Sequence, residues 1–294
     1  MLQFLVLGVA LIGCVIASYW DLKTTEVPDS VPYSMISAGI LIYLVQSILA
    51  NSIEPLANSV MMGISLFVFG YILYYFGQWG GADAKILSSI GFLLPDIPSV
   101  TISQSLPIFP LTLPFPLTYV ANLFMVGTVY MFIYAFFIAA NDRKIVSHFR
   151  KDVRSSTKLI LFSSVALFIF LSLIGVEFYR SIGADPEFYG VFSKSAITVI
   201  ATSAIFLLYK FARVVENVGF KKRIPVSDVK EGDVLMKSKV WVGIENAELH
   251  KLRSSGKKYV WIKEGVRFIP AFLLALIFTI YYGDIMFFVF GFLL

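Results

Sequence analysis

Two aspartates in a very apolar chain have the type and placement for acid–base chemistry. Asp21 directly follows the first apolar run, and Asp83 directly precedes a short apolar run further along. Two carboxyl groups a few ångströms apart cannot both ionise cheaply, so such a pair tends to share one proton. The charged member can act as general base on water, while the protonated member polarises a peptide carbonyl and later protonates the leaving amine. Asp21 and Asp83 are therefore the candidate catalytic residues for peptide-bond hydrolysis, with no metal and no organic cofactor expected.

Each aspartate, taken alone, also has a purely structural interpretation, and both interpretations stay open. Asp83 could be the N-cap of a helix that begins at Ala84, because Asp is among the best N-cap residues. Asp21 could be an interfacial residue beside an aromatic belt of Tyr19 and Trp20. Placement of both carboxylates on one face of the membrane, together with the small residues before Asp83, favours a functional pair.

Those small residues are Gly80, Gly81 and Ala82. They let the backbone approach a neighbouring helix, or an extended substrate strand, more closely than larger residues would. A peptide has to leave the helical form before its carbonyl can be attacked. We therefore expect this segment to lie beside the substrate.

The composition of the chain is that of a polytopic membrane protein. Of its 294 residues, 58% are hydrophobic and 15% are charged, whereas a soluble domain carries about 25% charged residues. Apolar runs of about 20 residues, the length that crosses a hydrocarbon core, recur along the chain. We expect an all-α fold with about eight transmembrane helices, the first of them retained because no basic residue precedes it as in a signal peptide. The expected spans are 2–19, 31–50, 56–76, 84–97, 115–140, 159–179, 195–212 and 266–290.

The distribution of Lys and Arg predicts the orientation of these spans. The segments 141–158 and 213–265 are rich in both residues, and the loops on the other side hold only Arg180 and Lys194. Cytoplasmic loops carry the excess of Lys and Arg. The pattern therefore predicts an N-terminus outside a plasma membrane and both Asp21 and Asp83 at its cytoplasmic face. It also accounts for the net charge of +5 without a nucleic-acid partner.

Two other segments differ from the spans. Residues 95–116 contain half of the chain's 12 prolines and cannot be helical. Residues 213–265 include the β-prone runs 240–242 and 259–262, with a turn at 254–256, which predicts a small cytoplasmic antiparallel β module. The expected organisation is a catalytic core at 1–140, a basic loop with an extra transmembrane hairpin at 141–212, the β module at 213–265 and a final helix at 266–294.

Cysteine and histidine give no sign of a metal site. Cys14 is the one cysteine, and His148 and His250 lie about a hundred residues apart in separate basic segments. Neither histidine has a partner at ligand spacing, so neither a disulfide framework nor a zinc site is expected.

The aspartates lie within motifs that resemble those of type IV prepilin peptidases. Asp21-Leu22-Lys23 followed by Val27-Pro28 is similar to the first motif of that family, in which an aliphatic-Pro pair follows the aspartate. The second motif, GxGD with a trailing Lys, is similar to the segment Gly80-Gly81-Ala82-Asp83-Ala84-Lys85. The archaeal prepilin and preflagellin peptidases fit best, since they share a proline-rich loop before a long span and a soluble segment before the last helix.

The resemblance implies an aspartic endopeptidase that removes short, basic class III leader peptides from pilin-like or flagellin precursors at the cytoplasmic face. It implies that Asp21 and Asp83 are the catalytic pair, with Gly80, Gly81, Ala82, Lys85, Lys23 and Pro28 as signature and supporting residues. Membrane lipid is the expected surrounding, and the sequence leaves the oligomeric state open.

Three features depart from the family pattern. Ala82 replaces the second glycine of GxGD, and residues 159–212 add a hairpin to the six spans of shorter archaeal members. The four-cysteine zinc module of the bacterial enzymes is absent from the sequence, so N-methylation of the trimmed pilin is not expected.

Two alternatives remain. An intramembrane GxGD protease of the presenilin or signal-peptide-peptidase type would use the same chemistry, and Pro270-Ala271 faintly resembles its Pro-Ala-Leu element. A proton-coupled transporter would use the carboxylates for coupling, but such proteins often contain internal repeats, and the two halves of this chain show no convincing one.

Overall fold

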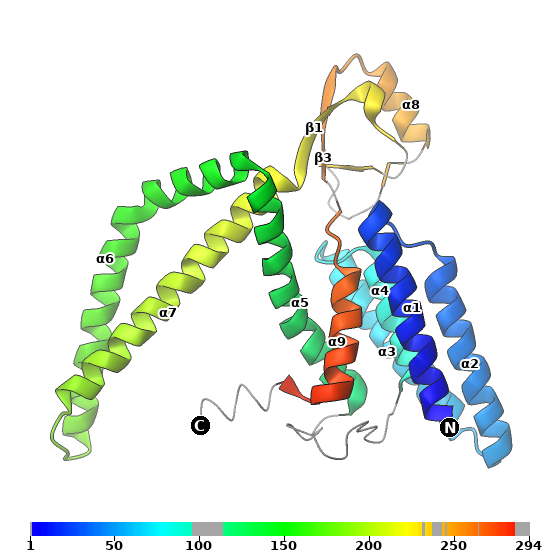
Figure 1. Ribbon diagram of the computed structural model, residues 1–294, viewed down its shortest axis with the longest axis horizontal. Helices are drawn as coiled ribbons and strands as arrows, with labels where there is room; N and C mark the ends of the chain where they lie inside the picture. Colours follow the sequence, from blue (N-terminus) through cyan, green and yellow to red (C-terminus); the bar gives the residue numbers. More distant parts are fainter. Residues whose placement is uncertain are drawn as a thin grey trace. The chain divides into compact units, whose positions relative to one another are not determined.

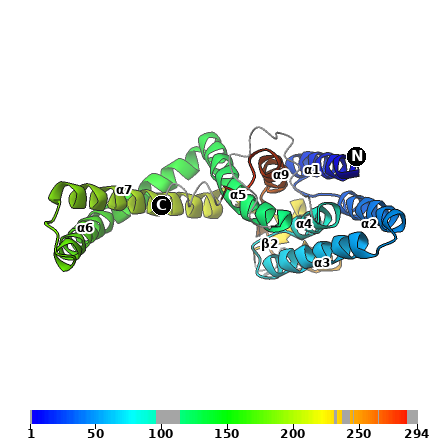
Figure 2. The same cartoon turned by 90° about the horizontal axis from the view of Figure 1, so that it is seen from below.

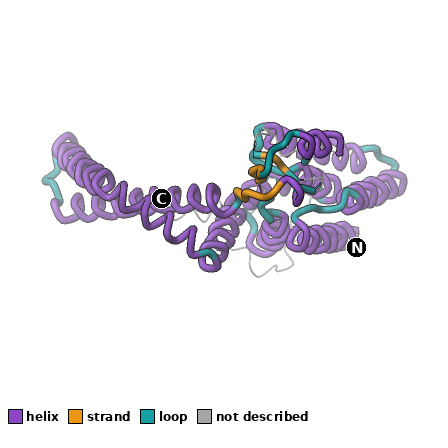
Figure 3. The backbone as a smooth tube through the Cα atoms, turned by 90° about the horizontal axis from the view of Figure 1, so that it is seen from above, coloured by secondary structure: helices purple, strands orange, loops and turns teal. Residues whose placement is uncertain are grey.

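The computed structural model describes residues 2–95, 114–230, 233–236, 243–244, 246–263 and 265–285, and it is mostly helical (Figure 1). Its helices are α1 (Leu2–Thr24), α2 (Ser30–Ala50), α3 (Glu54–Tyr75), α4 (Gly81–Leu93), α5 (Phe115–Asn141), α6 (Arg143–Ser181), α7 (Phe188–Val214), α8 (Asn246–Ser254) and α9 (Ile269–Tyr282). A π turn η1 (Val215–Gly219), a 3-10 turn η2 (Val226–Asp228) and the strands β1 (Lys221–Pro225), β2 (Val234–Leu235) and β3 (Tyr259–Lys263) complete the described elements. The tube view shows the strands gathered in one place (Figure 3).

Among the described residues, six helices are long and apolar enough to cross a membrane: α1, α2, α3, α5, α6 and α7 extended by η1. The predicted fold class, a helical multi-pass membrane protein with a small β module, is thus confirmed, but the count of eight spans is not. Helix α4 has 13 residues, about 20 Å at 1.5 Å per residue, against a hydrocarbon core of about 30 Å. Helix α9 is apolar but also short, with 14 described residues.

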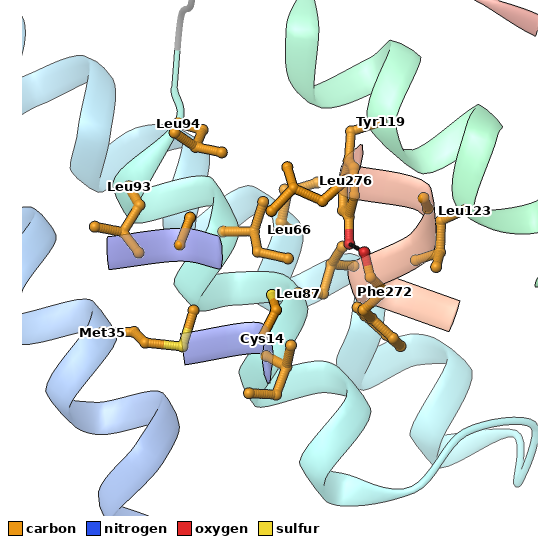
Figure 4. Packing of buried hydrophobic residues seen from close by; sticks show 14 of the residues in the cluster. Cys14, Met35, Leu66, Leu87, Leu93, Leu94, Tyr119, Leu123, Phe272 and Leu276 are labelled. Atoms are coloured by element: carbon orange, nitrogen blue, oxygen red, sulfur yellow. Dashed lines mark hydrogen bonds between the residues drawn. The ribbon is translucent and has the colours of Figure 1, made fainter. Parts of the chain in front are cut away.

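The chain forms two compact units, one made of residues 1–133 and 223–294 and the other of residues 134–222. In the first unit, α4 packs against α1, α2 and α3, and α9 packs against α1. Every residue of α4 from Ile86 to Leu93 is buried. Helix α4 is therefore an inner helix, covered by protein rather than by lipid. Figure 4 shows the side chains that pack around it, among them Leu66 and Met35 with Leu87 and Leu93.

Glycines allow α3 and α4 to approach closely. A Cβ atom at Gly70 would lie 2.8 Å from the Cα atom of Ala84. A Cβ atom at Gly91 would lie 2.9 Å from the carbonyl oxygen of Met62. Real Cβ contacts are longer, so both positions need glycine at this helix separation. This contact fixes the depth of α4, including the residue that precedes Ala84, which is Asp83.

Side chains from the surrounding helices also bind the carbonyl groups at the end of α4. Tyr43 donates a hydrogen bond to the oxygen of Leu93 at 3.0 Å, and Ser59 donates one to the oxygen of Phe92 at 2.6 Å. The last carbonyls of a helix have no partner within it. These two bonds satisfy carbonyl groups that would otherwise be costly to bury.

The β module has the strand order β1-β3-β2, with β2 antiparallel to β3. Val229, Ile244 and Leu249 form its small core. The predicted strand at 259–262 corresponds to β3, whereas the predicted strand at 240–242 lies outside the described residues. Helix α8, which the sequence did not indicate, precedes the turn at 254–256. In that turn Gly256 has a φ of +70°, a left-handed conformation that suits glycine.

The second unit is a helical hairpin of α6 and α7, which run side by side (Figures 1 and 2). Ser164 and Ser203 share a hydrogen bond of 3.1 Å across it, and Lys210 lies 2.8 Å from Asp152. The segment 141–158, predicted to be a loop, is helical from Arg143 and continuous with the following span. Asp142 caps it by accepting a hydrogen bond of 2.8 Å from the backbone N–H of Lys144.

Three further predicted features fall wholly or partly outside the described residues. These are most of the proline-rich segment 95–116, residues 96–97 of the fourth predicted span and residues 286–290 of the last one.

Candidate active site

Asp21 lies in the last turn of α1 and is 4% exposed. Its Oδ2 atom accepts a hydrogen bond of 2.9 Å from the backbone N–H of Ile269. Ile269 is the first residue of α9, so its N–H is one of those that the helix itself cannot pair. The Asp21 side chain therefore caps the N-terminal end of α9, a helix that begins 248 residues later in the chain.

The segment before α9 also brings a positive charge towards Asp21. The guanidinium of Arg267 interacts electrostatically with the Asp21 carboxylate. The backbone oxygen of Arg267 accepts a hydrogen bond of 2.8 Å from the hydroxyl of Tyr130 on α5. The end of α1, the start of α9 and one residue of α5 are thus tied together around Asp21.

Asp83 is the third residue of α4 and is 9% exposed. Its Oδ2 atom accepts a hydrogen bond of 2.8 Å from the backbone N–H of Gly80. The helix begins at Gly81, not at Ala84, so Asp83 lies inside the first turn and is not the N-cap residue. The structural interpretation of Asp83 is correct to the extent that its carboxylate stabilises the start of α4.

The two carboxyl groups lie close enough for the charge of Asp21 to act on Asp83. They come from α1 and α4, which pack against each other within the first unit. The structure therefore brings together the two aspartates that the sequence placed on one face. Both are largely withdrawn from water, and the low effective dielectric of such a site strengthens their interaction.

Gly80 and Gly81 do not have the packing role predicted for them. Gly80 has φ −79° and ψ 163°, an extended conformation open to any residue. A Cβ atom at Gly80 would lie 3.4 Å from Oδ2 of Asp83, and one at Gly81 would lie 3.9 Å from the Tyr74 ring, both ordinary contacts. The close approach to a neighbouring helix occurs at Gly70 instead. Gly80 and Gly81 place no side chain beside Asp83, and Ala82 packs partly buried against the core.

Lys85 connects the two motif segments. Its Nζ atom lies 2.5 Å from Oδ1 of Asp29 and 5.7 Å from the centre of the Tyr33 ring. Asp29 directly follows Pro28, whose backbone oxygen accepts a hydrogen bond of 3.0 Å from Val31 at the start of α2. Asp29 was not among the predicted site residues. The pairing with Lys85 was missed because a contact across 56 positions leaves no local pattern.

Lys23 has a different environment. Its exposed side chain lies 3.4 Å from the Tyr19 hydroxyl and over the rings of Tyr19 and Trp20, at 5.5 and 5.6 Å from their centres. Lys23 therefore contacts both residues of the predicted aromatic belt, Tyr19 and Trp20.

An aromatic cluster supports the segment that leads to Gly80. Trp79 is 7% exposed, and its ring centre lies 6.0 Å from that of Phe124 and 5.6 Å from that of Phe272. It links the α3–α4 connection to α5 and α9. Trp79 was not among the predicted site residues, although a tryptophan next to the glycine-rich motif was a usable signal.

Asp284, near the C-terminal end of α9, is buried at 1% exposure. Next to it, the Nδ2 atom of Asn122 donates to the oxygen of Gly283 at 2.7 Å and to Oγ1 of Thr279 at 2.9 Å. This polar group holds the C-terminal end of α9, whereas Asp21 holds its N-terminal end.

Comparison with known proteins agrees with the motifs. Residues 8–141, which include Asp21 and Asp83, match the model of the type IV leader peptidase family. The chain is 26% identical over 182 residues to the prepilin peptidase EppA of Methanothermobacter thermautotrophicus, covering 60% of this chain and 47% of the relative. It is 31% identical over 130 residues to the preflagellin peptidase of Methanococcus voltae, covering 42% of this chain and 55% of the relative.

A third relative, the preflagellin peptidase of Methanocaldococcus jannaschii, is 32% identical over 87 residues, which are 30% of this chain and 37% of the relative. The chain spans about half the length of the first two relatives. The resemblance to archaeal prepilin and preflagellin peptidases is confirmed.

Proposed function

We propose that this protein is a membrane aspartic endopeptidase that removes class III leader peptides from type IV pilin-like or flagellin precursors. The observation that carries the proposal is the pairing of Asp21 and Asp83, buried in one unit and close enough to interact electrostatically. The family match of residues 8–141 and the names of the relatives support the reaction and the class of substrate.

In the proposed mechanism the carboxyl pair shares one proton, which belongs to the pair rather than to either residue. The charged member takes a proton from a water molecule, and the water oxygen attacks the scissile carbonyl carbon. The protonated member donates a hydrogen bond to the carbonyl oxygen and then gives a proton to the leaving amine. Each aspartate uses Oδ2 for its backbone hydrogen bond, and we assign the Oδ1 atoms to water and substrate.

The lack of side chains at Gly80 and Gly81 supports a binding position for the substrate backbone. Side chains there would project towards Asp83 and Tyr74. Because neither position needs glycine for its own conformation, the absence of side chains serves instead to admit an extended peptide beside Asp83. The aromatic contacts of Trp79 keep this strip of backbone in place.

Neutralisation of each aspartate tests the assignment. The full chain is reconstituted in liposomes with a pilin-like precursor, and leader release is followed by gel shift. Asp21→Asn and Asp83→Asn should each abolish cleavage, while Asp228→Asn, in the η2 turn, should cleave as the unmodified protein does. Normal cleavage by either of the first two variants would contradict the assignment.

We further propose that the N-terminus lies outside and that the site faces the cytoplasm. The excess of Lys and Arg in 141–158 and 213–265 supports this orientation. Cys14 is buried and is the one cysteine of the sequence, so a Cys14→Ala background allows single labels. A cysteine at exposed Lys257 should react with an impermeant maleimide only in inside-out vesicles. Reaction in right-side-out vesicles would reverse the orientation.

The names of the relatives do not favour the two alternatives. A presenilin-type protease would cut within the bilayer, so mass spectrometry of the released peptide distinguishes it. A transporter would show proton-driven uptake in proteoliposomes that is lost in Asp83→Asn.

A further inference from the structure

Helix α6 is much longer than a membrane span. Its 39 residues extend over about 58 Å, nearly twice the thickness of a hydrocarbon core of about 30 Å. Its second part, from residue 159, is apolar, while residues 143–158 contain its basic residues apart from Arg180. About half of α6 therefore lies outside the hydrocarbon core.

The first part of α6 has two distinct faces. Ile145 is fully buried, and Phe149, one turn later, packs against Phe211 at a ring distance of 5.4 Å. Val215 completes this contact. The apolar face is thus occupied by the end of α7 and by η1, within the same unit.

The other face is exposed and positive. At 100° per residue, its Lys and Arg residues fall within an arc of about 120° on the helix. We name this set the basic face: Arg143, Lys144, Arg150, Lys151, Arg154 and Lys158, all exposed.

Acidic residues near the basic face are already engaged. Asp152 is paired with Lys210 of α7 at 2.8 Å, and Asp142 caps α6 through the N–H of Lys144. Neither carboxylate neutralises the six cations. The positive charge of this face is therefore available to anions outside the hairpin.

The shape of α6 suits a position of this charge beside the membrane. Figure 1 shows that α6 curves strongly, so that its first part runs at an angle to its second part. A helix that turns where it leaves the hydrocarbon core stays near the headgroup layer instead of projecting into water. Long Lys and Arg side chains reach phosphate groups from such a position.

We propose that the basic face of α6 binds anionic phospholipid headgroups of the leaflet in which the hairpin emerges. Charge complementarity selects this occupant, since a class III leader is itself basic and would be repelled. The contact anchors the hairpin in the membrane plane and is independent of the peptidase chemistry.

A spin label tests the proposal on the full chain. In the Cys14→Ala background, a nitroxide is attached at Ser147→Cys, an exposed position in the first part of α6. Nanodiscs contain phosphatidylcholine alone or with phosphatidylglycerol, plus a trace of lipid with a Ni²⁺-chelating headgroup. We expect faster nitroxide relaxation in the phosphatidylglycerol discs, because the headgroups then hold the label close to Ni²⁺.

Charge removal supplies the matched comparison. Arg150→Gln with Lys151→Gln and Arg154→Gln should abolish the difference between the two lipid compositions. Lys251→Gln with Lys257→Gln and Lys258→Gln removes the same charge from exposed positions elsewhere and should preserve it. Equal relaxation in both lipids with the basic face intact, or an equal loss in both triple variants, would overturn the proposal.

Discussion

The ammonium group of Lys85 lies 2.5 Å from a carboxylate oxygen of Asp29. Lys85 follows Asp83 by two positions on α4, and Asp29 follows the loop after Asp21 and leads into α2. The ion pair therefore joins the two segments that carry the proposed catalytic residues. Because both side chains are partly exposed, the pair contributes little to stability, and its effect is on position.

Removing either partner of this pair should slow cleavage without unfolding the protein. We expect Lys85→Gln and Asp29→Asn to lower kcat severalfold, with a change in unfolding free energy below about 1 kcal/mol. Exchange of the charges, Asp29→Lys with Lys85→Asp, should recover part of the loss. Failure of the exchanged pair to recover any activity would show that the charge interaction is not what positions α4.

Gly70→Ala should disturb Asp83 from a distance. Its Cβ atom would lie 2.8 Å from the backbone of Ala84, and such overpacking costs about 1–3 kcal/mol. We expect a lower melting temperature and slower cleavage. Gly8→Ala is the matched control, since nothing lies within 4 Å of its added Cβ. It should leave cleavage unchanged and should stabilise α1 by up to about 1 kcal/mol.

Arg267 should act on the reaction through Asp21. Its charge interacts with the Asp21 carboxylate, so Arg267→Gln should reduce kcat on the order of tenfold, about 1.4 kcal/mol in activation free energy. KM should change little, because Arg267 is assigned no contact with substrate. Arg267→Lys should retain most of the activity, and Arg180→Gln, at an exposed position, should retain all of it. An effect on KM alone would contradict this role.

The hydroxyl of Tyr119 donates a hydrogen bond of 3.1 Å to the oxygen of Phe272, and Figure 4 shows this contact between α5 and α9. Tyr119→Phe should lower the unfolding free energy by about 0.5–1.5 kcal/mol, the net contribution of one such bond. Thermal unfolding in detergent measures the change. Tyr281→Phe, at an exposed tyrosine on α9, should leave the melting temperature as it is; an equal shift in both variants would point to a general effect of removing a hydroxyl.

The sequence predicted those features that depend on local pattern or on membrane topology. Apolar runs indicated the long helices, and the number of crossings between Asp21 and Asp83 predicted that both would reach the same end. The runs did not predict that α4 is too short to span a typical core, because a buried helix and a membrane span have the same composition. Segment 141–158 was predicted to be a loop because that prediction used its charge and not its helical periodicity.

Contacts between distant segments could not be predicted from the sequence. The bond from Ile269 to Asp21, the pair of Lys85 with Asp29 and the contact of Gly70 with Ala84 each join positions that no single sequence pattern connects. Sequence reasoning assigned close packing to Gly80 and Gly81, when it belongs to Gly70. A motif indicates which residues matter, but it does not say which of them touch a neighbour.

The hydrogen bond between Asp21 and the start of α9 can form only late in the synthesis of the chain. Because the ribosome synthesises α1 first and α9 late, the partner of Asp21, the backbone N–H of Ile269, is made only after nearly the whole chain has been translated. A growing chain that has not reached Ile269 carries both aspartates but lacks the group that holds one of them. The proposed site is thus complete only after most of the chain has been synthesised.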